Sequence, residues 1–142
     1  VTVFRPPAVY GPGDRELRPL LDGLYRGLGF IPGHRGRFAL IFVDDLVDAV
    51  LAWLARPAAV DGCFELDDGT TGGYDWDMVI DAVGRLRGRR VVALRIPRRL
   101  LGAVARVNGW LQGTLGRQPM LTAGKVRELY HPDWTCDGAP FA

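Results

Sequence analysis

The chain contains no serine and a single lysine, Lys125, although 18 of its 142 residues are Lys or Arg. Without serine there is no Gly-x-Ser-x-Gly elbow, which excludes a hydrolase of that type. Arginine favours bidentate contacts with phosphate or carboxylate, but an excess of Arg can equally follow from the base composition of a gene. The net charge is only +2, and no basic stripe carries interleaved aromatic residues, so no nucleic-acid partner is expected.

Cysteine and histidine are also scarce. Cys63 and Cys136 stand far apart, so neither a disulfide framework nor a zinc site is expected. His34 and His131 lie at no metal-ligand spacing from Cys, Asp or Glu, and therefore no metal is expected. No signal peptide is recognisable, and no apolar run approaches the roughly 18 residues of a membrane span. We therefore expect a cytoplasmic protein without a membrane span.

The residues that are present predict one loop-rich α/β domain. Hydrophobic residues make up 48% of the chain, and 19 Gly and 10 Pro punctuate it. Apolar and β-branched runs predict strands at Val1–Phe4, Phe30–Ile31, Phe38–Val43, Cys63–Leu66 and Val91–Leu94. Because strand patterns alternate with helical ones, a partly parallel sheet is expected. The segment Arg5–Asp14 is predicted to be loop, and the tail His131–Ala142 to be irregular.

Helical spacing of apolar residues predicts five helices, over about Arg15–Leu28, 45–55, Trp76–Leu86, Arg98–Leu115 and Thr122–Tyr130. Three aspartates, Asp14, Asp44 and Asp75, are placed as N-caps of the first three helices. Pro19 falls in the first turn of its helix, where a missing N–H is tolerated. The longest helix carries one apolar face, formed by Leu100, Val104, Val107, Leu111 and Leu115.

No complete catalytic constellation is present. The glycine-rich turns at Gly11–Gly13, Gly33–Gly36 and Gly69–Gly73 do not match the G-x-G-x-x-G fingerprint of dinucleotide binding. A catalytic tyrosine usually needs a nearby cation to lower its pKa, but the residue four positions after Tyr10 is Asp14. These glycines are therefore interpreted as turns, and no residue of this chain is predicted to be catalytic.

Positive charge is concentrated in the second half of the chain. The residues concerned are Arg85, Arg87, Arg89, Arg90, Arg95, Arg98, Arg99 and Arg106. One interpretation is contact with phosphate or with an anionic membrane face, together with the helix at Arg98–Leu115. The other is a solvated surface around a helix–strand junction.

Two stretches together carry a family resemblance. "FRPPAVYGPGDRE", followed some 25 residues later by "LIFVDDLVDAVLAWL", resembles the NAD-dependent epimerase/dehydratase family, the extended short-chain dehydrogenases/reductases. "GCFELDDGTTGGYDWDMVIDAVGR" and "LTAGKVRELYHPDWTCD" agree with it. The resemblance covers nearly the whole chain.

This resemblance implies a Rossmann-like extended short-chain dehydrogenase fold, of which residues 1–142 form the C-terminal, substrate-binding portion. The N-terminal half would carry the glycine-rich dinucleotide loop and the Tyr-x-x-x-Lys pair, neither of which occurs in this sequence. The implied chemistry is hydride transfer for epimerisation, dehydration or ketone reduction, by a full-length enzyme that can form a homodimer. This chain alone is not expected to catalyse the reaction. The alternative is a self-standing binding module that uses the sheet edge at Val1–Phe4.

The resemblance also implies contacts for a cofactor and a substrate. The segment beside the nicotinamide of NAD or NADP would be Pro6, Pro7, Ala8 and Val9. The substrate contacts would be Tyr10, Arg15, Arg37 and Phe38. Nucleotide-sugar members often place a phosphate-binding Arg five residues before the valine of "VDDL"; here Phe38 holds that place, with Arg37 beside it. A nucleotide sugar and an apolar ketone or alcohol therefore both stay open as substrates.

Overall fold

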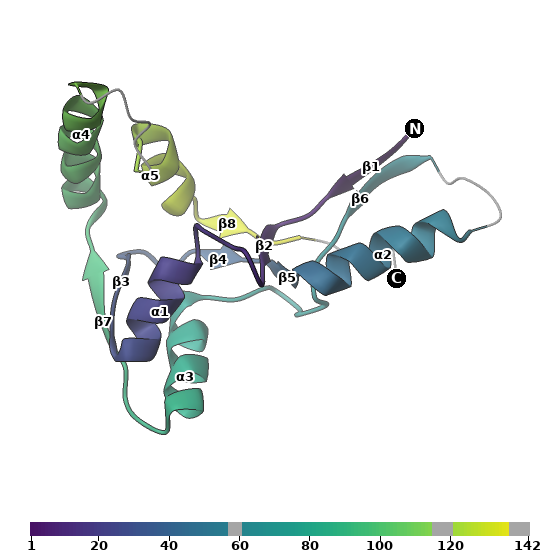
Figure 1. Cartoon of the computed structure of the whole chain (residues 1–142), viewed down its shortest axis with the longest axis horizontal. Coiled ribbons are helices and arrows are strands. Elements are labelled where there is room, and N and C mark those ends of the chain that lie inside the picture. The colour runs from purple at the N-terminus through teal and green to yellow at the C-terminus, as the bar shows by residue number, and fades with distance from the viewer. Residues whose placement is uncertain (57–60, 115–120, 137–142) are drawn as a thin grey trace.

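The computed structural model describes residues 1–56, 61–114 and 121–136 and shows a mixed α/β fold (Figure 1). The strands are β1 (Thr2–Arg5), β2 (Ala8–Tyr10), β3 (Leu28–Pro32), β4 (Arg37–Phe38), β5 (Leu40–Phe42), β6 (Gly62–Glu65), β7 (Val92–Ile96) and β8 (Asp133–Trp134). The helices are α1 (Arg18–Arg26), α2 (Val43–Leu54), α3 (Trp76–Arg87), α4 (Arg98–Thr114) and α5 (Ala123–Leu129). The predicted α/β class is confirmed.

The described strands pair two by two, and each pair is parallel. The pairs are β1 with β6, β2 with β5, β3 with β7, and β4 with β8. Parallel neighbours cannot be joined by a tight hairpin, so each pair is closed by a long excursion of the chain. Segments far apart in sequence are therefore brought side by side throughout the fold.

The main core lies between the β3–β7 pair and the helices α1 and α3. Its fully or nearly buried members are Leu24, Ile31, Trp76 and Val83. Gly29 on β3 is required there, because a Cβ at this position would lie 2.3 Å from Cδ2 of Leu24. Both helices cover the same face of the strand pair, and the opposite face carries exposed apolar side chains. Those side chains are Leu28, Phe30, Val92 and Leu94.

A second group of elements, β1, β6 and α2, lies at the other end of the molecule (Figure 1). Aromatic contacts hold it together: the ring of Phe4 meets Trp53 edge-on at 5.7 Å and lies 6.3 Å from Phe64. Such pairs stabilise beyond the area they bury. The outer side of α2 is exposed at Val47, Leu51 and Leu54, so this group presents an apolar surface.

Two helices begin at the side-chain caps expected of such sequences. Asp75 caps α3 by accepting a hydrogen bond from the N–H of Met78 at 2.9 Å, as predicted. Thr122 caps α5 through the N–H of Lys125 at 3.1 Å. Pro19 occupies the first turn of α1, also as predicted. The two caps accept hydrogen bonds from N–H groups that a helix start leaves unsatisfied, and the proline stands where a missing N–H costs nothing.

The other two predicted caps are wrong. The carboxylate of Asp14 accepts from the N–H groups of Glu16 and Leu17, which closes a turn before α1 begins at Arg18. Helix α2 begins directly after β5, with Phe42 at its N-cap position. Asp44 therefore stands inside the first turn, where its charge complements the helix dipole.

Two predicted irregular segments contain strands. Ala8–Tyr10, within the predicted loop Arg5–Asp14, forms β2 and pairs with β5. Asp133–Trp134, within the predicted irregular tail, forms β8 and pairs with β4. Both are short and gain their hydrogen bonds from distant partners, so local sequence carries little sign of them. The tail beyond Cys136 lies outside the described residues.

Replacing Asp75 tests whether its carboxylate caps the first turn of α3. We expect Asp75→Ala to lower the free energy of unfolding by about 1 kcal/mol, because the N–H of Met78 loses its acceptor. Asp81→Ala, on an exposed position within the same helix, is the matched control and should stay within about 0.5 kcal/mol of the parent. Urea unfolding of the full natural-length protein measures both. Equal losses would show that the Asp75 carboxylate does not act as a cap.

Candidate functional site

The candidate site is built on the carboxyl ends of the parallel strands β2 and β5. In their register Tyr10 stands beside Phe42, and the two rings lie 5.4 Å apart. Ligands of open α/β sheets bind beyond the carboxyl ends of strands. The first and second motifs of the sequence therefore meet at the edge where a ligand is expected.

Gly11 makes this meeting possible. Its φ is +150°, and a Cβ built there would lie 2.6 Å from Cγ1 of Val43, the first residue of α2. Any larger residue would force the chain leaving β2 away from the start of α2. The glycine after Tyr10 and the valine of "VDDL" are thus packed against each other.

Of the four residues predicted to contact a cofactor, Pro6 and Pro7 link β1 to β2, and Ala8 and Val9 are the first two residues of β2. Pro6 and Ala8 are exposed, whereas Pro7 and Val9 are half-buried. Each proline fixes its own φ, so the exposed side of this connection has a defined shape. The segment is therefore available as one wall of a ligand site, and its contact with NAD or NADP stays a prediction.

Arg15 lies on the turn that follows, beside an open surface hollow of about 590 Å³. Asp14 orders this turn by accepting the N–H of Glu16 at 2.8 Å and that of Leu17 at 3.1 Å. Two further arginines, Arg18 and Arg26, line the hollow, where they are partly balanced by Asp14 and Asp22. An anionic or strongly polar group fits this lining better than an apolar one.

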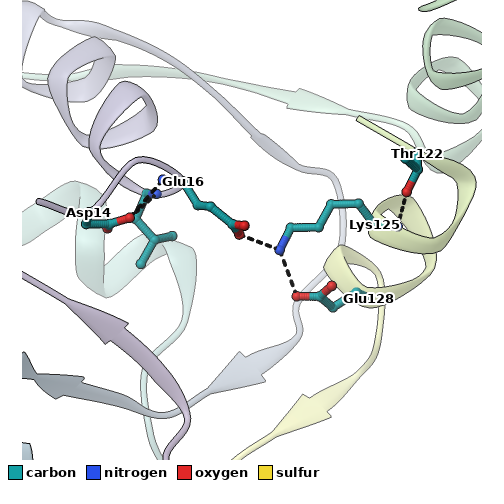
Figure 2. Close-up of polar contacts among 6 residues, drawn as sticks. Asp14, Glu16, Thr122, Lys125 and Glu128 are labelled. Atoms are coloured by element: carbon teal, nitrogen blue, oxygen red, sulfur yellow. Dashed lines mark hydrogen bonds and ion pairs between the residues drawn. The ribbon is translucent and has the colours of Figure 1, made fainter. Parts of the chain in front are cut away.

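The single lysine ties this turn to helix α5. Figure 2 shows Lys125 reaching from α5 to Glu16, with its Nζ 2.7 Å from the carboxylate of Glu16 and 3.0 Å from that of Glu128. The hydrogen bond to Glu16 is the main cause that raises the pKa of Lys125 above its ordinary value of 10.5. Because Glu16 adjoins Arg15, this bridge fixes the backbone that carries the predicted substrate contact.

Arg37 and Phe38 are engaged within the protein. The guanidinium of Arg37 donates to the carbonyl of Gly72 and, at 2.9 Å, to that of Gly73. The ring of Phe38 packs 4.9 Å from Trp76, and its backbone exchanges two hydrogen bonds with Tyr74. Arg37 thus holds the end of the loop Asp67–Gly73, and Phe38 holds the residues that follow it. The contact of both with a substrate stays a prediction.

A polar cluster on that loop was missed by the sequence analysis. The hydroxyl of Tyr74 donates to the carboxylate of Asp68 at 2.5 Å and lies 2.8 Å from the hydroxyl of Thr70. The bond to Asp68 raises the pKa of Tyr74, and the nearby Tyr10 adds a smaller effect in the same direction. Tyr74 is therefore a neutral donor, unsuited to act as a base at pH 7. The only signal in the sequence was that Asp68, Thr70 and Tyr74 lie within seven positions of one another.

Within residues 1–56, 61–114 and 121–136, no three His, Cys, Asp or Glu side chains are grouped so that they could hold a metal ion. Among the helices of these residues, none has the length and apolar character needed to cross a membrane.

Comparison with known proteins gives no matching family model. A curated relative, the ceramide reductase of Caulobacter vibrioides, is 34% identical over 143 residues, which covers 99% of this chain. The chain spans 44% of the length of that relative. The similarity thus extends across the whole of this chain but over less than half of the relative.

Solved structures also match most of this chain over less than half of their own length. The structure of gox2253 matches 99% of this chain and 44% of its own, with a TM-score of 0.60 and 16% identity. The NAD complex of UDP-glucose 4-epimerase from Thermus thermophilus matches 89% of this chain and 46% of its own, with a TM-score of 0.52 and 18% identity. The chain has the fold of part of an NAD-dependent epimerase/dehydratase, so the resemblance indicated by its motifs is confirmed at the level of the fold.

A pair of glycine variants tests the packing of the two motifs. Gly11 and Gly13 both have positive φ, but only at Gly11 would a Cβ meet another atom within 4 Å. We expect Gly13→Ala to cost about 1 kcal/mol through backbone strain alone. Gly11→Ala should cost at least about twice as much, because the methyl group also displaces Val43. Urea unfolding midpoints compare the two, and equal costs would contradict the close contact.

The pH dependence of the Lys125 bridge gives a second test. Since the pKa of Lys125 is raised in the folded state, its stabilising effect is full below about pH 10.5 and is lost as the pH rises through the folded value. We expect Lys125→Met to lower the free energy of unfolding by less than about 1 kcal/mol at pH 7, because the carboxylates are exposed. This difference should stay constant from pH 7 to about pH 9 and shrink above about pH 10.5. A difference that grows above about pH 10.5 would contradict the ion pairs.

Proposed function

We propose that this chain is the substrate-binding portion of an NAD(P)-dependent reductase that acts on the carbonyl group of a long-chain lipid. The observation that carries the proposal is the 34% identity to a ceramide reductase along 99% of the chain. The solved relatives reported above share less than 20% identity, so their fold supports the cofactor class more than the substrate. A cytoplasmic location belongs to the same proposal.

The cofactor side of the site is the segment Pro6–Val9, which links β1 to β2 and begins β2. It leaves the carboxyl end of β1 and exposes Pro6 and Ala8, as a wall beside a nicotinamide ring requires. A bound NADH or NADPH would supply a hydride for the carbonyl carbon of the substrate. This chain's own part is to orient the substrate and to exclude water, since no Tyr stands four residues before its single Lys.

The substrate side combines a polar and an apolar region. Arg15 lies on the ordered turn beside the hollow, where its guanidinium can hold the polar head of a lipid. Tyr10, half-buried against Phe42, offers a ring and a hydroxyl at the end of β2. Because Phe38 stands where a phosphate-binding arginine is usual in nucleotide-sugar enzymes, an unactivated substrate fits the residues better.

A nucleotide sugar is the second candidate substrate. It is supported by the likeness to UDP-glucose 4-epimerase and by Arg37, one residue from the usual phosphate contact. Against it, Arg37 already donates to Gly72 and Gly73, so binding a diphosphate there would compete with the order of that loop.

The experiment uses the protein at its full natural length. Oxidation of NADH and NADPH is followed by nicotinamide absorbance with a long-chain N-acylated amino ketone and, separately, conversion of UDP-glucose is followed. We expect turnover of the lipid ketone and none of the sugar nucleotide. Arg15→Ala should lower kcat/KM about tenfold, as expected for loss of one charge-assisted hydrogen bond.

Arg85→Ala is the matched control, because Arg85 is exposed on α3 and lines no part of the hollow beside Arg15. Residues 1–142 alone should show no nicotinamide oxidation. Turnover of UDP-glucose without turnover of the ketone would replace the proposal by its second candidate. Activity of residues 1–142 alone would overturn the assignment of this chain as a substrate-binding portion.

A further inference from the structure

Helix α4 carries a continuous apolar stripe that faces solvent. Its members are Leu100, Val104, Val107 and Trp110, which are 48–71% exposed. With a helical repeat of about 3.6 residues, spacings of four, three and three place these side chains along one side of the helix. Four large apolar side chains on one exposed side are unusual for a surface that meets only water.

The inner side of the same helix is already covered. Ala105 is only 3% exposed, and α4 packs against α5, where Val126 is 5% exposed. The stripe is therefore separate from the face that holds α4 in the fold. Figure 1 places α4 at the end of the molecule opposite β1, β6 and α2, with α5 beside it.

The charge of α4 is entirely positive. Residues 98–114 include Arg98, Arg99 and Arg106 and no Asp or Glu. Arg99 and Arg106 are seven residues apart and thus share one flank of the helix, and Arg106 precedes Trp110 by one turn. Cationic side chains therefore border the Trp110 side of the apolar stripe.

We propose that this arginine-bordered stripe of α4 docks the protein on an anionic lipid bilayer. Helices of this kind lie in the plane of the membrane interface, with Trp and Leu among the acyl chains and Arg at the phosphates. The charges of Arg98, Arg99 and Arg106 complement lipid phosphates. The inference concerns where the protein binds and does not depend on the proposed activity.

The test is co-sedimentation of the full natural-length protein with vesicles of phosphatidylcholine alone or mixed with phosphatidylglycerol. We expect binding to the anionic vesicles at low ionic strength and much weaker binding at high salt. Trp110→Ala should weaken it about tenfold, by loss of a large apolar side chain from the interface. Arg99→Gln and Arg106→Gln should each weaken it about fivefold.

Two matched controls change residues in α3 or just after it, and Figure 1 shows that α3 and α4 lie at opposite ends of β7. Leu86→Ala removes a side chain that is 79% exposed, and the pair Arg85→Gln with Arg89→Gln removes two exposed charges. Neither control should change vesicle binding more than about twofold. Circular dichroism of every variant checks that the fold is kept.

Three outcomes would overturn the proposal. The first is no binding to anionic vesicles at low salt, and the second is equal loss in the α3 controls and the α4 variants. The third is a homodimer that Trp110→Ala dissociates, which would assign the stripe to a second copy of the chain. Because vesicle binding is measured without substrate or nicotinamide, its failure is distinguishable from failure of the proposed reductase activity.

Discussion

The parallel pairing of β2 with β5 is the interaction on which the arrangement of the site depends. It places Tyr10 beside Phe42 and brings Gly11 against Val43. Neither strand has more than three residues, so ladder hydrogen bonds alone cannot fix their position. The contact of the ring pair and the close approach at Gly11 set the register, and the turn that carries Arg15 leaves from that point.

The parts of the fold that could be predicted from sequence are those with a local physical cause. Asp75 precedes a helical run and offers its carboxylate to the N–H three residues on. The apolar run around Ile41 predicts the strand β5, but the predicted strand Phe38–Val43 was too long, because it is divided into β4 and β5 and Val43 begins α2. Asp14 has the same chemistry, yet its carboxylate closes a turn instead. The choice between a cap and a turn is made by packing beyond the segment, which a local pattern does not contain.

Strands β2 and β8 could not be predicted for a related reason. Asp133–Trp134 has two residues, and its partner Arg37–Phe38 lies almost a hundred positions earlier. The same applies to the site: the resemblance singled out Arg37 and Phe38, whereas their partners Gly72, Gly73 and Trp76 are visible only once the loop has folded back. The residues that carry the motif could be predicted from the sequence, but the protein groups that Arg37 and Phe38 already contact could not.

Two exposed surfaces of the chain, the edge of β1 and the outer side of α4, differ in physical kind. Among the described residues, β1 forms a strand ladder with β6, and a further polypeptide strand could bind beside it only by matching backbone N–H and C=O groups in register. Helix α4 satisfies its backbone within itself and presents side chains alone, apolar with a cationic border. A surface of the first kind calls for polypeptide in register. A surface of the second kind has no register to match. The interface of an anionic lipid bilayer can therefore accept both parts of it, the apolar side chains among the acyl chains and the arginines at the phosphates.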